Sequence, residues 1–200
     1  MLLNKNRNTI DLSVGFSFPI ETISFIKKFF SIDVMGIYDR STSSLDKDSL
    51  VLRIQNTKPD IITAKNNYFY LYYQDFLGDL DNTYGNTDIL TISDFFNPKN
   101  LLRKLAGKNM GFEFLVSKLR YLDTSQAGRW FSYIKYFYGL CKRYGHQLIL
   151  SSGARNIYEI ISLRMINAIL DRLEVSATEY WSDLNHWLSR KKRGIIYDPL

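Results

Sequence analysis

One stretch of the sequence decides the fold: Gln147-Leu148-Ile149-Leu150-Ser151-Ser152-Gly153-Ala154. Its apolar run is too short for a helix and stops at two hydroxyl groups, a glycine and an alanine, which predicts a buried parallel strand. The carboxyl ends of strands in α/β sheets and barrels carry ligand contacts, so Ser151, Ser152 and Gly153 are candidate binding residues. The plainer interpretation, which the motif alone favours, is a tight turn between a strand and a helix.

A long amphipathic helix is predicted before this strand. Asp123 and Gln126 have the spacing of a capping box, and Gly145 is a typical helix end. The apolar stripe between them makes Cys141 a core residue rather than a nucleophile. Its members are Ala127, Trp130, Phe131, Ile134, Phe137, Tyr138 and Cys141.

Helix starts also follow the strand. Two of them compete, one at Asn156 with Glu159 three residues later and one at Ser162. A last helix is predicted from the capping box formed by Ser176 and Glu179. The predicted strand is therefore part of a helix–strand–helix unit.

Strand and helix signals alternate through most of the remaining chain, which indicates the α/β class. Residues 50–74 differ, because three strand-favouring runs follow one another there without an obvious helix between them. The predicted strands are 9–14, 34–38, 51–54, 61–63, 68–73, 88–92 and 111–116, and the predicted helices are 20–30 and about 98–106. Glu113 lies inside an apolar strand, so we expect either a basic partner, the favoured interpretation, or an inward-facing functional carboxylate.

The composition fits one domain spanning residues 1–200. The chain has 200 residues, which is short for a complete eight-stranded barrel, and no apolar run near the length of a membrane-spanning helix. Cys141 is the only cysteine, so no internal disulfide can form, and a reducing compartment is indicated. We therefore expect a cytoplasmic protein without a membrane partner.

Positive charge is concentrated in the second half of the chain. Residues 1–100 carry 10 Lys and Arg against 12 Asp and Glu, whereas residues 101–200 carry 16 against 8. A basic half of this kind suggests that the partner is a polyanion, usually a nucleic acid. The charge by itself is explained equally well by basic residues on ordinary solvated faces. Lys118, Arg120 and Arg155 follow strands, and the run Arg190-Lys191-Lys192-Arg193 ends the last helix with more cations than its dipole requires.

No catalytic constellation is visible. His146 and His186 are the only histidines, and neither has a neighbouring ligand at metal spacing. Ser152 lacks the upstream glycine of a nucleophile elbow, and there is no glycine-rich phosphate loop. We predict no catalytic residue, metal site or protein-bound cofactor, which favours a binding or scaffold role.

A family resemblance appears around the deciding stretch. The run Gly145–Ala154, followed by Tyr158-Glu159-Ile160 and Leu163-Arg164, resembles the protein component 3 family of ribonuclease P, the thirty-kilodalton class. That family follows Ser-Ser-Gly-Ala with an aromatic–acidic–aliphatic triplet and Arg-x-Pro-Arg. Here Arg164 matches the last arginine, while Ile161 and Leu163 replace the first arginine and the proline. The resemblance is good over about 111–194, including Phe112-Glu113-Phe114, and weak before it apart from Asp11-Leu12.

The resemblance implies an α/β barrel similar to a TIM barrel and related to the polymerase-and-histidinol-phosphatase superfamily. The pattern of this sequence adds the expectation that the barrel is incomplete or distorted in the 40–86 region. It implies a subunit that binds ribonuclease P RNA together with a small second protein during removal of the 5′ leader from precursor tRNA. Magnesium would be used by the RNA. Arg164, at a helix amino end, is the first candidate for a phosphate contact, followed by Arg155, Lys118, Arg120 and residues 190–193.

Two other functions stay open. The first is a divergent metal-dependent phosphoesterase on the same barrel, with a carboxylate-only site formed by Asp11 and Glu113. The histidine-rich metal motif of that superfamily is missing from residues 11–15. The second is a protein scaffold whose aromatic surface, for instance Tyr68–Tyr73, binds another subunit without touching RNA.

Overall fold

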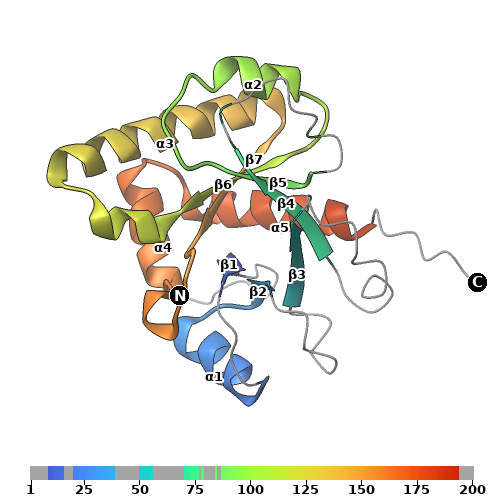
Figure 1. Cartoon of the computed structure of the whole chain (residues 1–200), viewed down its shortest axis with the longest axis vertical. Helices are drawn as coiled ribbons and strands as arrows, with labels where there is room; N and C mark the ends of the chain where they lie inside the picture. The colour runs from blue at the N-terminus through green and yellow to red at the C-terminus, as the bar shows by residue number, and fades with distance from the viewer. Residues whose placement is uncertain are drawn as a thin grey trace, which may run out of the picture.

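The structure is a computed structural model that describes residues 9–15, 20–38, 50–55, 70–76, 78, 84 and 87–193. The predicted strand 61–63 lies outside these residues. Within them, a seven-stranded sheet runs in chain order with every neighbouring pair parallel (Figure 1). Its strands are β1 (Ile10–Val14), β2 (Val34–Ile37), β3 (Leu50–Gln55), β4 (Tyr70–Asp75), β5 (Ile89–Thr91), β6 (Gly111–Leu115) and β7 (Gln147–Ser151).

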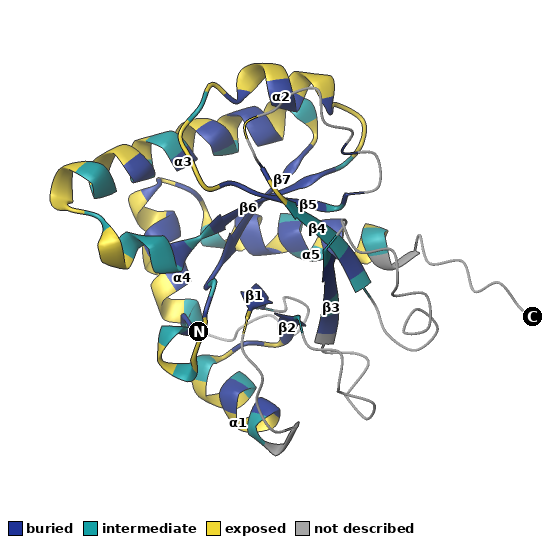
Figure 2. Ribbon diagram, in the orientation of Figure 1, coloured by how far each residue is buried: buried dark blue, intermediate teal, exposed yellow. Residues whose placement is uncertain are grey.

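The helices lie on the outside of this sheet, with their buried faces toward the strands and their exposed faces outward (Figure 2). One helix follows β1, two helices and a 3₁₀ turn flank β6, and the rest follow β7. They are α1 (Ile20–Phe30), α2 (Lys99–Lys104), η1 (Val116–Tyr121), α3 (Thr124–Tyr144), η2 (Ile157–Glu159), α4 (Leu163–Arg172) and α5 (Ala177–Arg193). Helices on the faces of a parallel sheet bury both sides of its strands, and β1 and β7 are buried throughout.

The sheet curls into a nearly closed barrel, which confirms the predicted fold class. The backbones of β1 and the segment after β7 pair near the carboxyl ends of the strands, through a bridge between Val14 and Ala154. Gly15 N–H donates to the Ala154 carbonyl oxygen at 2.7 Å, and Ala154 N–H donates to the Ser13 carbonyl oxygen at 3.2 Å. The deciding stretch of the sequence is therefore the segment that closes the barrel.

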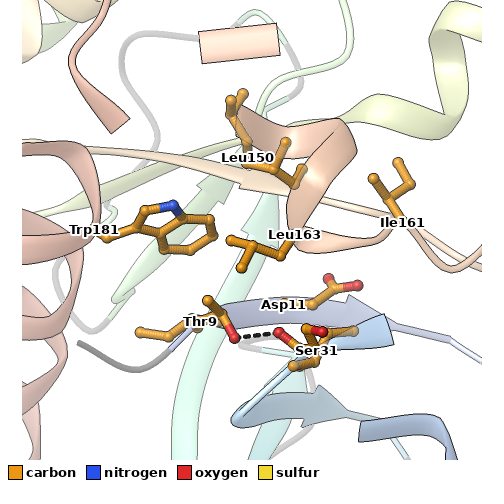
Figure 3. Close-up of a pocket in the computed structure, with 10 residues that line it drawn as sticks. Thr9, Asp11, Ser31, Leu150, Ile161, Leu163 and Trp181 are labelled. Carbon is orange, nitrogen blue, oxygen red and sulfur yellow. Dashed lines mark hydrogen bonds between the residues drawn. The ribbon is translucent and has the colours of Figure 1, made fainter. Parts of the chain in front are cut away.

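The remainder of the β1–β7 seam is filled by side chains of α4 and α5. Leu150 N–H, which has no strand partner at the seam, donates to the Tyr180 hydroxyl at 2.8 Å. A cavity of about 10 Å³ lies between the seam and these helices, and Leu163 and Trp181 face Thr9 across it (Figure 3). This volume holds about one water molecule, far less than a small-molecule site requires.

The local helix signals are confirmed. Asp123 and Gln126 form the reciprocal capping box of α3, and Gly145 ends that helix with a φ of 72°. Cys141 is buried in the core. Ser162 Oγ accepts from Met165 N–H at 3.4 Å and Ser176 Oγ accepts from Glu179 N–H at 3.3 Å, so these serines begin α4 and α5.

Candidate nucleic-acid interface

The predicted strand-end cations lie on two short segments at the carboxyl end of the barrel. β6 runs directly into η1, which carries Lys118 and Arg120, and β7 leads through Arg155 to η2. β6 and β7 are neighbours in the sheet, and Arg120 Nη2 donates to the Tyr158 carbonyl oxygen at 3.0 Å. The structure therefore brings η1 and η2 together on the face where parallel barrels carry their ligand contacts.

These cations differ in accessibility. Arg120 and Arg155 are exposed. The Lys118 ammonium is partly withdrawn, because its Nζ donates to the Ser93 carbonyl oxygen at 3.0 Å and burial lowers the pKa of Lys118. Arg120 and Arg155 are thus the stronger candidates for a phosphate.

Arg164 lies in the first turn of α4 and is exposed. The competing helix start at Asn156 produces only the short turn η2, in which Asn156 Oδ1 accepts from Tyr158 N–H at 3.0 Å. The carboxylate of Glu159 accepts from Arg155 N–H at 2.7 Å instead of completing a capping box. Both predicted starts exist, and Ser162 begins the longer helix.

The basic run at the end of α5 lies at the opposite end of the barrel. Lys191 Nζ lies 2.7 Å from Oδ1 of Asp88, the residue immediately before β5. It also lies 5.7 Å from the ring centre of Trp187. Trp187 Nε1 in turn donates to the Asn109 carbonyl oxygen at 2.9 Å, just before β6. Arg190 is exposed, whereas the side chains of Lys192 and Arg193 lie outside the described residues. The run therefore does not join the strand-end cations, and Lys191 has a structural partner.

The side chains of Ser151 and Ser152 point into the barrel wall, where both are buried. Ser151 Oγ donates to Glu113 Oε1 at 2.7 Å, and Ser152 Oγ donates to the Ser13 carbonyl oxygen at 3.1 Å. Gly153 has a φ of 64°, and a Cβ there would lie 2.9 Å from Leu115 Cβ. The motif helps to close the barrel, and its two hydroxyl groups donate hydrogen bonds to other residues of this chain.

Arg53 is the interior residue that the sequence did not single out. It forms a bidentate pair with Glu113, with Nη1–Oε1 at 2.6 Å and Nη2–Oε2 at 2.8 Å, and both side chains are fully buried. Its Nη1 also donates to the Leu12 carbonyl oxygen at 2.6 Å, and its guanidinium lies 4.9 Å from the ring centre of Tyr38 and 4.6 Å from that of Tyr73. The favoured interpretation of Glu113, a paired interior carboxylate, is confirmed.

Asp11 and Glu113 do not form an open carboxylate site. Beyond Arg53 and Ser151, Glu113 accepts from Thr91 Oγ1 at 3.0 Å, so protein donors occupy both of its oxygens. Burial would raise the pKa of Glu113, but the pair with Arg53 lowers it. No group of three or more potential metal ligands occurs among the residues that the structure describes. This arrangement disfavours the phosphoesterase hypothesis.

Asp11 is a buried carboxyl group without an ion-pair partner in the described part of the chain. Its Oδ1 accepts from Ser152 N–H at 3.0 Å and from Ser13 N–H at 3.2 Å. Burial raises the pKa of Asp11 from 3.8 to about 6, and these N–H donors oppose the shift without cancelling it. The carboxylate therefore destabilises the seam when it ionises.

This shift predicts a pH-dependent effect of Asp11→Asn. Because the folded pKa lies above the unfolded one, the stabilisation from Asp11 is complete below pH 3.8 and is lost as the pH rises through about 6. We expect the free energy of unfolding of Asp11→Asn, relative to the original protein, to rise by about 2 kcal/mol between pH 4 and pH 7. Urea unfolding at both pH values measures it, and a difference independent of pH would contradict it.

Sequence comparison finds no matching family model and no matching curated protein. No helix in the described residues is long and apolar enough to cross a membrane. Structural comparison does find a match, a chain in the cryo-EM structure of archaeal Ribonuclease P with mature tRNA. The two chains are 15% identical and superpose with a TM-score of 0.69 over 96% of this chain and 95% of that chain. They share a fold along nearly their whole lengths.

Proposed function

We propose that this chain is a protein subunit of a ribonuclease P, which binds the catalytic RNA and supports it during removal of the 5′ leader from precursor tRNA. The observation that carries the proposal is the agreement of the fold over 96% of this chain and 95% of a chain in the archaeal complex. The resemblance of Gly145–Arg164 to the protein component 3 family supports it independently, because it rests on local sequence.

In this proposal the protein contributes cations and the RNA contributes the chemistry. Arg120, Arg155 and Arg164 neutralise phosphates and so offset repulsion within the folded RNA. Magnesium is used by the RNA, and precursor tRNA is bound indirectly. A small second protein subunit shares the RNA, and the assembly works in the cytoplasm.

The proposal is tested by precursor tRNA cleavage with ribonuclease P RNA, with and without this protein and the small second subunit. We expect the protein to lower the magnesium concentration needed for cleavage, because its cations replace part of the counterion requirement. If the folded protein has no effect on cleavage, the scaffold hypothesis is favoured instead. Metal-dependent hydrolysis by the protein without any RNA would favour the phosphoesterase.

Changing Arg164 to alanine tests the first phosphate candidate. We expect weaker RNA binding and a salt dependence, as log K against log salt, that is shallower by about 1. The melting temperature should shift by no more than about 2 °C, because the side chain is exposed. Arg172→Ala, at the other end of α4, is the matched control. A large loss of thermal stability in Arg164→Ala would make the residue structural.

A further inference from the structure

Two strongly exposed tyrosines stand at the carboxyl end of the barrel. Tyr158 in η2 has 87% of its surface exposed, and Tyr121 at the end of η1 has 77% exposed. They lie on the two segments that Arg120 joins through its bond to the Tyr158 carbonyl oxygen. Rings left this open offer aromatic surface to a ligand.

The backbone of Tyr158 is fixed although its ring is free. Its N–H donates to Asn156 Oδ1 at 3.0 Å, and its carbonyl oxygen accepts from Arg120. The flanking Glu159 N–H donates to the Asn156 carbonyl oxygen at 3.1 Å. Because the backbone is already fixed, a ligand that stacks on the ring orders only the side-chain torsions of Tyr158.

Two arginines accompany the exposed rings. Arg120 and Arg155 are exposed on the same two segments. The acidic residue of η2, Glu159, directs its carboxylate to Arg155 N–H at 2.7 Å. Exposed aromatic rings and exposed guanidinium groups on adjoining segments fit a ligand with flat rings and a negatively charged backbone.

We propose that Tyr158, assisted by Tyr121, is a stacking platform for unpaired RNA nucleotides, whose phosphates Arg120 and Arg155 contact. Paired bases hide their faces inside the duplex, so only unpaired nucleotides can use the ring. The inference rests on the proposed function, since it names the form of RNA that this face takes. Tyrosine and arginine also occur at protein–protein contacts, and the experiment below separates the two kinds of partner.

The probe is a short unpaired RNA carrying 2-aminopurine, compared with the same RNA annealed to its complement. Titrated with the full chain, the fluorescence of 2-aminopurine is quenched when the base stacks. We expect Tyr158→Ala to weaken binding of the unpaired RNA by roughly 5- to 150-fold and to abolish quenching, since stacking contributes about 1–3 kcal/mol per base. Tyr158→Phe should keep both, and Tyr136→Ala, a half-exposed tyrosine on α3, is the matched control.

The salt dependence separates stacking from charge. Tyr158→Ala should leave the slope of log K against log salt unchanged, whereas Arg155→Ala should make it shallower by about 0.7. Unchanged RNA binding by Tyr158→Ala, equal weakening for duplex and unpaired RNA, or loss in Tyr158→Phe would each overturn the inference. If Tyr158→Ala binds RNA normally but no longer binds the small second subunit, the ring belongs to a protein contact instead.

Failure of this inference is distinguishable from failure of the proposed function. If the protein supports precursor tRNA cleavage but quenching does not depend on Tyr158, only the stacking platform is wrong. If quenching depends on Tyr158 but cleavage gains nothing from the protein, the platform stands and the ribonuclease P assignment falls.

Discussion

Replacing Arg53 with methionine is expected to destabilise the protein by about 3–5 kcal/mol, because it leaves the Glu113 carboxylate buried without its cation. Both side chains of the pair are fully buried. The substitution also removes the donor to the Leu12 carbonyl oxygen. For a chain of this size the melting temperature should fall by roughly 6–20 °C, measured by circular dichroism.

A double-mutant cycle identifies the pair as the cause. Arg53→Met combined with Glu113→Gln should cost less than the sum of the two single changes, because the double variant buries no uncompensated charge. The control is Lys135→Met, which breaks a pair with Glu174 whose side chains are 49% and 77% exposed. It should change the free energy of unfolding by less than about 1 kcal/mol. Additive effects at Arg53 and Glu113 would contradict the prediction.

Gly36→Ala is expected to have an effect of similar size for a steric reason. A Cβ at Gly36 would lie 2.2 Å from the Leu12 carbonyl oxygen, which belongs to the backbone of the neighbouring strand. The β1–β2 register shifts between Asp11 and Val14, and the Leu12 carbonyl turns to Arg53 in this interval. The added methyl group would push β1 away from β2 and disturb the contact with Arg53. We expect a loss of about 3 kcal/mol or more in urea unfolding.

A glycine-to-alanine change in α3 is expected to alter the free energy of unfolding in the opposite direction. Gly128 lies in α3, and a Cβ there would meet nothing within 4 Å. Gly128→Ala should therefore stabilise the protein by about 0.5–1 kcal/mol, because alanine is the better helix former. Equal effects at the two glycines would rule out the steric explanation for Gly36.

The sequence predicted those features that depend on neighbouring residues. The α3 capping box, the Gly145 helix end and the strand at Gln147–Ser151 each follow from residues within a few positions of one another. A strand-end position could also be predicted for Arg120 and Arg155, because parallel strands share a direction. That Arg120 joins η1 to η2 could not, since η1 has no distinctive sequence signal.

Contacts across the barrel could not be predicted from patterns of neighbouring residues. Glu113 indicated a basic partner, but Arg53 lies 60 residues earlier, in the region where strand-favouring runs follow one another without an obvious helix. Within the Arg190–Arg193 run, charge alone does not reveal that Lys191 pairs with Asp88, which lies immediately before β5. Burial and pairing of charges depend on the register of the whole sheet.

The seam has a consequence for how the protein is made. β1 leaves the ribosome long before β7, and the backbone bridge that closes its other edge is to Ala154, about 140 residues after Val14. Until then the nascent sheet has two open edges, at β1 and at its newest strand, and open edges are templates for pairing with other chains. The seam is filled only once α4 and Tyr180 have followed. We therefore expect chains truncated between Ser151 and Ala177 to aggregate during synthesis, whereas chains that reach the end of α5 close their own barrel.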